Sequence, residues 1–192
     1  MKIRTKAKLK HPSMTHDPSQ KLAIDNQPGY YIRRLHQISV AIFLQQTEAF
    51  GITPVQYAAL QTVGNSPEID QRSLARTIGL DTSTIAGVID RLESRGLLVR
   101  CASPDDRRVK QLTLTDAARQ LLAEVAPAML KAQQLILEPL EAGDQVEFTR
   151  LLRQLVTKNN ELSRAPSAGG VERQASSSAE KQNGPCGPFL ST

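Results

Sequence analysis

The chain has 192 residues, 40% of them hydrophobic and 22% charged, with a formal net charge of +5. This length can bury a hydrophobic core, and no apolar stretch approaches the ~20 residues of a membrane-spanning helix. The two distant cysteines and three scattered histidines offer no metal-ligand spacing. We therefore expect a cytoplasmic protein that needs no metal ion or cofactor and contacts no membrane.

The net charge is concentrated in residues 1–13, which hold five of the 24 basic residues and no acidic one. The rest of the chain has as many basic as acidic residues and so no net charge. Any affinity of this part for nucleic acid must therefore come from a local patch. Residues 1–27 lack a core-forming pattern and are predicted to be a basic and polar flexible arm. The arm either helps to hold phosphates or begins with a dispensable leader, because Met14 is an alternative start.

A long amphipathic helix is predicted over about residues 28–50, with Pro28 in its first turn and Gly51 at its end. Thr53 is placed to cap a second helix that has Pro54 at its first position. The Gly-Asn-Ser-Pro run at 64–67 then breaks the chain.

Two short helices follow, over about residues 70–79 and 81–95, separated by a turn of three or four residues. That spacing is typical of a helix-turn-helix. Residues 97–101 and 109–114 then read as two strands on either side of the charged turn SPDDRR at 103–108. A hairpin behind a helix-turn-helix is the arrangement of a winged helix.

Two further helices are predicted, from Thr115 to about Leu140 and from Gly143 to about Leu162. The apolar faces of the terminal helices exceed what one small winged domain can cover, so we predict that they pair two chains in a homodimer. The predicted fold is mainly α with a small β-wing. A winged helix-turn-helix at about 53–114 is flanked by N- and C-terminal dimerisation helices at about 28–50 and 115–162. Residues 163–192, rich in Gly, Pro, Ser and Gln, are predicted to be a disordered tail.

Residues 73–115 resemble the winged helix-turn-helix of the MarR family of bacterial transcription regulators. The similarity lies in SLARTIGLDTSTIAGVIDRLESRGLLVR, followed by D-x-R within PDDRR and then by LTLT. It extends over about residues 28–162 and implies a DNA-binding regulator, more often a repressor, that binds a pseudo-palindromic operator as a homodimer. Residues 29–63 are most similar to repressors of aromatic-acid catabolism, among them those of nicotinate degradation that respond to 6-hydroxynicotinate.

The helix over 81–95 is the predicted recognition helix, whose first-turn hydroxyls can reach bases or phosphates. By themselves these hydroxyls are more typical of a helix cap, and it is together with the wing that they indicate contacts in the groove. The resemblance implies that Arg108 enters the minor groove, that Asp106 orients it, and that Arg107 and Lys110 meet phosphates. The patch at 95–110 has five basic and two acidic residues. The candidate DNA contacts are Arg72, Arg76, Thr82, Ser83, Thr84, Gly87, Arg91, Asp106, Arg107, Arg108 and Lys110, although Arg72 and Arg76 fit a solvated surface equally well.

The resemblance also implies an effector site between the dimerisation and DNA-binding regions. An Arg or His beside an aromatic ring suits a small aromatic carboxylate. The candidates are Arg33, His36, Gln56 and Tyr57, each of which is also compatible with a structural or solvent-facing role.

Two other functions stay open. Cys101, next to Arg100, allows a redox-sensing repressor, and a winged helix can bind protein instead of DNA. An enzyme is not expected, because the sequence has no phosphate loop and no set of nucleophile, histidine and acid.

Overall fold

The computed structural model describes residues 23–103, 109–163 and 165–167. The chain divides into two compact units between Gln37 and Ile38, within helix α1 (Pro28–Thr47). In the first unit, a 3-10 helix, η1 (Ile24–Asn26), lies within the predicted arm and precedes α1. The rings of Tyr30 and Tyr31 meet edge to face, with centroids 5.4 Å apart.

In the second unit, α1 ends at Thr47, whose hydroxyl donates to the carbonyl of Phe43 at 2.8 Å. A 3-10 helix, η2 (Glu48–Phe50), continues to Gly51, which has a left-handed φ of +56°. Gly51 thus ends the helical segment as predicted, because a residue without Cβ adopts this conformation readily.

Helix α2 (Pro54–Asn65) begins with the predicted cap at Thr53 and proline at its first position. The cap is reciprocal. The Gln56 backbone N–H donates to Thr53 Oγ1 at 3.3 Å, and the Thr53 N–H donates to Gln56 Oε1 at 3.1 Å. Two backbone donors at the start of α2 are satisfied in this way.

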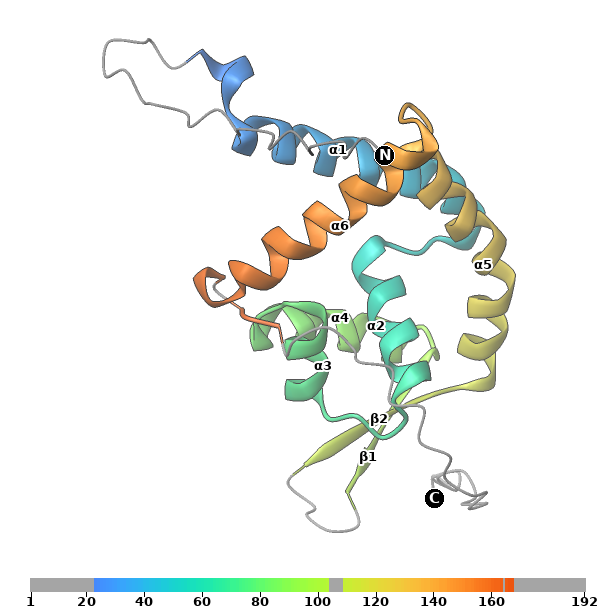
Figure 1. Ribbon diagram of the computed structural model, residues 1–192. Helices are drawn as coiled ribbons and strands as arrows, with labels where there is room; N and C mark the ends of the chain where they lie inside the picture. Colours follow the sequence, from blue (N-terminus) through green and yellow to red (C-terminus); the bar gives the residue numbers. More distant parts are fainter. Residues whose placement is uncertain (1–22, 104–108, 164, 168–192) are drawn as a thin grey trace, which may run out of the picture. The chain divides into compact units, whose positions relative to one another are not determined.

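The predicted helix-turn-helix is present as α3 (Gln71–Ile78) and α4 (Thr82–Ser94). Gly79, at a φ of +69°, ends α3, and Asp81 caps α4. The wing follows as an antiparallel pair, β1 (Leu98–Ala102) and β2 (Lys110–Leu114), that projects from the helices (Figure 1). The fold is therefore mainly helical with a two-stranded wing, as predicted.

One core joins the helix-turn-helix to the wing. Its largest fully buried side chains come from α2, α3, α4 and both strands, and they include Leu60, Leu74, Ile85, Ile89, Leu92, Leu98 and Leu112. The backbone of Ile69, just before α3, accepts a hydrogen bond of 3.0 Å from Leu112 N–H, which fixes the wing base to α3. Burial of each such side chain contributes about 1.5–3 kcal/mol.

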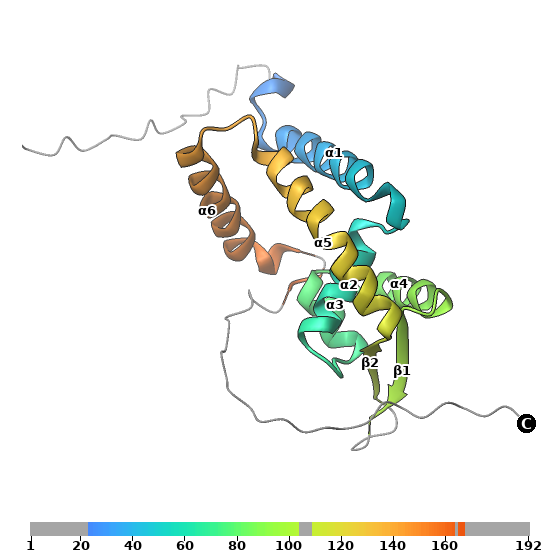
Figure 2. The same cartoon turned by 90° about the vertical axis from the view of Figure 1, so that its right-hand side faces the viewer.

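Helices α5 (Asp116–Leu137) and α6 (Ala142–Lys158) run in roughly opposite directions (Figure 2), and η3 (Asn160–Leu162) follows. Thr115 caps α5, while α6 begins at Ala142, one residue before the predicted Gly143. No residue of α6 is buried. None of the helices in the described ranges is long and apolar enough to cross a membrane.

Candidate nucleic-acid interface

The first turn of α4 is built around the carboxylate of Asp81. That carboxylate accepts from the backbone N–H groups of Ser83 and Thr84 at 3.0 and 2.8 Å. It also accepts from both hydroxyls, at 2.6 and 2.7 Å. These hydrogen bonds, the Ser83 hydroxyl first, hold the pKa of Asp81 far below its ordinary value. The side chains of Ser83 and Thr84 therefore take part in the cap, and their outward lone pairs leave them as exposed acceptors.

One face of α4 carries three of the predicted DNA contacts. Ser83, Gly87 and Arg91 are four residues apart, so they follow one another along a single helix face. Ser83 and Arg91 are exposed, and Gly87 is half-buried. A Cβ built on Gly87 would have the Arg91 guanidinium, 3.9 Å away, as its nearest neighbour. We call this row the α4 stripe; Thr82 and Thr84 lie exposed on either side of its first residue.

Three predicted phosphate contacts surround one hollow of about 470 Å³ between α3 and the wing. Arg72 and Arg76 stand one turn apart on α3, and Lys110 begins β2. All three side chains are exposed. Asp70 also lines this hollow, so its charged lining has three cations and one acid. That excess of positive charge suits a phosphate backbone, which carries negative charge along its whole length.

The tip of the wing, with Asp106, Arg107 and Arg108, lies outside the described residues. The described part ends where Ser103 N–H donates to Val109 O at 2.9 Å, closing the hairpin before the charged turn. The structure therefore places the base of the wing but not its predicted minor-groove arginine.

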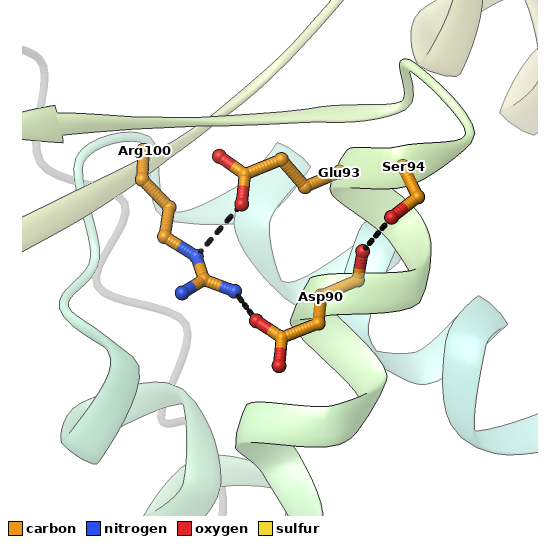
Figure 3. Close-up of polar contacts among 4 residues, drawn as sticks. All are labelled: Asp90, Glu93, Ser94 and Arg100. Carbon is orange, nitrogen blue, oxygen red and sulfur yellow. Dashed lines mark hydrogen bonds and ion pairs between the residues drawn. The ribbon is translucent and has the colours of Figure 1, made fainter.

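The structure describes three of the basic residues in the 95–110 patch, and two of these, Arg95 and Arg100, have partners within the chain. Arg95 donates to the carbonyl of Gly51 at 2.8 Å. The guanidinium of Arg100 lies between the carboxylates of Asp90 and Glu93 (Figure 3). Arg95 and Arg100, which add to the charge of the patch but were not predicted to contact DNA, are engaged with groups of the fold itself.

The predicted effector residues fall in both units. Arg33 and His36, in the first unit, are exposed. The Arg33 guanidinium donates to Gln37 Oε1 at 3.3 Å and lies 5.5 Å from the ring centroid of Tyr30. In the second unit, Tyr57 packs edge to face on Phe43 with centroids 6.2 Å apart, and partial burial raises the pKa of its hydroxyl.

Gln56 has a structural role that its sequence context could have revealed. It is only 8% exposed, and its amide oxygen is used by the α2 cap and by Arg95 at 3.4 Å. The spacing Thr53-x-x-Gln56 is the pattern of a capping box.

A hollow of about 520 Å³ lies beside this cap and was not predicted. It is lined by Leu44, Gln45, Thr47, Glu48, Gly51, Ile52 and Thr53.

The comparisons with known proteins agree with this arrangement. The MarR family model matches residues 52–110. A protein assigned to transcriptional regulation of the hcr operon in Thauera aromatica is 32% identical over 134 residues, which cover 69% of this chain and 81% of that protein. The chain belongs to the MarR family.

Two solved structures of transcription regulators are also similar to this MarR-family chain. BpsR of Bordetella bronchiseptica, whose DNA binding is regulated by 6-hydroxynicotinic acid, is 29% identical, with a TM-score of 0.68 over 71% of this chain and 97% of BpsR. The repressor CouR, solved on a 23-mer DNA duplex, is 27% identical, with a TM-score of 0.66 over 71% of this chain and 99% of CouR. This MarR-family protein is a DNA-binding transcription regulator and not an enzyme.

Proposed function

We propose that this MarR-family regulator is a homodimeric repressor of aromatic catabolism genes in the bacterial cytoplasm. It leaves a pseudo-palindromic operator when it binds a small aromatic acid such as 6-hydroxynicotinate. The observation that supports the DNA-binding part best is the α4 stripe, with Ser83 and Arg91 exposed, together with the hollow lined by three cations of α3 and β2.

In this proposal the α4 stripe enters the major groove. Ser83 and Thr84 accept hydrogen bonds from base amino groups, since their own protons are held by Asp81. Gly87 permits close approach of the helix, while Arg91 and the Thr82 hydroxyl reach bases or phosphates. Arg72, Arg76 and Lys110 hold the backbone and fix the register of the protein on the duplex.

The wing carries the second contact. Arg108 reaches into the minor groove, Asp106 orients its guanidinium, and Arg107 meets a phosphate. An arginine in a narrow minor groove responds to A·T-rich shape and not to individual base edges.

The partner that covers the terminal helices is proposed to be a second copy of the chain. Along α6, Val146 is 73% exposed, Leu155 53% and Val156 64%, and Leu162 just beyond it 83%. Scattered exposed apolar residues are normal, but a helix with no buried residue and this many apolar ones needs a covering surface. Pairing two chains would place two recognition helices about one DNA turn apart, on an operator of about 20 base pairs.

The effector is proposed to act by favouring a dimer whose recognition helices do not fit the operator. Such a shift requires different affinities of the ligand for the two states. In the first unit, Arg33 and His36 are the proposed partners for a carboxylate. In the second unit, Tyr57 is the proposed residue for packing on an aromatic ring. Gln56 takes part only if the ligand replaces Arg95 on its amide oxygen.

The test is binding of the protein to duplex DNA from its own upstream region, followed by fluorescence anisotropy at two salt concentrations. Tight, salt-sensitive binding that 6-hydroxynicotinate releases, and benzoate does not, agrees with the whole proposal. Binding that neither acid releases contradicts the proposed effector but agrees with the DNA-binding function. If an Arg108→Glu variant binds duplexes selected from a random pool as well as the wild type does, the assigned role of the wing is wrong.

A further inference from the structure

Arg100 connects the wing to the recognition helix. It lies in the middle of β1, opposite Leu112 of β2, and its side chain extends to α4. There it donates to Asp90 Oδ1, while its Nε atom lies 3.2 Å from Glu93 Oε2 (Figure 3). The Arg100 side chain is 26% exposed, against 63% for Asp90 and 43% for Glu93.

The two acids occupy an unfavourable place for a DNA-binding helix. Asp90 directly precedes Arg91 of the α4 stripe. Glu93 lies about one turn after Asp90 on the same helix. Without a counter-ion, the helix would bring two negative charges toward a groove lined by phosphates. Arg100 is the cation that the structure places against both of them.

The geometry of the wing also depends on this contact. A two-stranded hairpin with five residues in each strand is marginally stable by itself, so its direction is set by what it packs against. The buried Leu98 and Leu112 hold one side of the hairpin to the core. The Nε atom of Arg100 is buried and makes no hydrogen bond in the described residues, so the Glu93 carboxylate, 3.2 Å away, compensates it by charge.

We propose that Arg100 is a positioning residue for DNA recognition. It neutralises Asp90 and Glu93 and holds the wing at a fixed angle to α4, without touching DNA itself. This inference rests on the DNA-binding function of the chain, and it assigns to Arg100 a role different from that of Arg72, Arg76 and Lys110.

The two roles predict different responses to sequence and salt. Loss of a phosphate contact weakens binding to all duplexes about equally and lowers the salt slope by about one. Loss of a positioning contact weakens the selected duplex most, because only specific binding needs the wing and α4 in register. The ratio of affinities for a selected and a scrambled duplex therefore separates them.

The experiment uses the full chain and a duplex that the wild type selects from a random pool. We expect Arg100→Gln to lower affinity for the selected duplex about tenfold or more and for the scrambled duplex about threefold or less, with the salt slope on the scrambled duplex nearly unchanged. The double swap Asp90→Arg with Arg100→Asp should restore part of the ratio, because the pair with position 90 is re-formed with its charges exchanged, while Glu93 loses its cation.

Arg119→Gln is the control, since Arg119 is also an ion-paired arginine, with Asp116 as its partner at 3.1 Å. It should leave the ratio unchanged. Arg100→Lys keeps the charge and should retain most of the ratio, and it supplies the comparison if Arg100→Gln does not fold by circular dichroism.

Three results would overturn the proposal. They are an equal loss on both duplexes with a smaller salt slope, no change in the ratio, and a swap that rescues nothing. A wild-type protein that selects no duplex overturns the DNA-binding function together with this inference.

Discussion

The guanidinium of Arg95 donates a hydrogen bond to the backbone carbonyl of Gly51, 44 residues earlier in the chain, at 2.8 Å. Arg95 is the C-cap of α4, and Gly51 ends the turn between α1 and α2. The same guanidinium reaches Phe50 O and Gln56 Oε1, both at 3.4 Å. One side chain therefore joins the end of the recognition helix to the start of α2.

Replacing Arg95 with alanine should lower the free energy of unfolding by about 1 kcal/mol, because a charged donor to several acceptors is lost from a partly exposed site. Urea denaturation measures this change. Arg91→Ala, one turn earlier and exposed, is the control and should change the stability by less than about 0.5 kcal/mol. Equal effects of the two variants would argue against a structural role for Arg95.

Gly87→Ala should separate stability from DNA binding. A Cβ at this position meets no atom closer than 3.9 Å, so alanine should stabilise α4 by about 0.5–1 kcal/mol. If α4 approaches the groove floor closely at Gly87, the same methyl group should weaken operator binding about tenfold. Thermal unfolding and anisotropy together test this. Gly143→Ala in α6, also without a contact, should leave DNA binding unchanged; unaltered binding by Gly87→Ala would contradict the close approach.

The cap of α4 should give the fold a specific sensitivity to acid. The folded-state pKa of Asp81 lies below its unfolded value of about 4, so the carboxylate contributes stability above that pH and loses it progressively as the pH falls further. Asp81→Asn keeps a capping oxygen but does not titrate. The stability difference between wild type and variant should be constant from pH 7 to about pH 5 and shrink below about pH 4. A constant difference down to pH 3 is the contrary outcome.

The cations around the hollow between α3 and the wing should contribute to the salt dependence of DNA binding. Changing Arg72, Arg76 or Lys110 to glutamine should weaken binding to selected and scrambled duplexes by similar factors and lower the salt slope by about one each. Titrations at several salt concentrations provide the slopes. Lys131→Gln on α5 is the control and should not alter them. A variant with an unchanged slope would remove its residue from the phosphate contacts.

The exposed apolar face of α6 should govern the oligomeric state. Leu155→Glu is expected to convert the proposed dimer to a monomer in sedimentation velocity, because it introduces a charge into an apolar interface. Operator affinity should fall with it, since two half-sites are no longer bound together. Gln154→Glu, which introduces the same charge at the neighbouring position, is the matched control for Leu155→Glu. A wild-type monomer would contradict the homodimer directly.

The winged helix was predictable because its boundaries are set by local chemistry. Thr53, Asp81 and Thr115 are caps, and Gly51 and Gly79 end helices in left-handed conformations, so the sequence alone indicates where these helices begin or end. The family resemblance is likewise confirmed, because it rests on that same ordered set of helices and strands.

The partners of individual charges were less predictable. Arg95 and Arg100 were counted in the basic patch at 95–110, yet their partners come from other elements. Gly51 lies 44 residues from Arg95, and Asp90 lies ten residues from Arg100. Periodicity gives the face of a helix but not which acid on a neighbouring helix an arginine reaches. Gln56 was predicted to be an effector residue, yet its spacing from Thr53 is that of a capping box, so its structural role could have been predicted.

In-vitro selection from a random duplex pool is the direct measurement of sequence-specific DNA binding through α4 and the wing. We expect enrichment of a pseudo-palindrome of about 20 base pairs, bound at least about a thousandfold tighter than scrambled DNA, and we expect this binding to be lost in the Arg108→Glu variant. Enrichment of no sequence, or binding that Arg108→Glu leaves intact, would contradict this mode of binding.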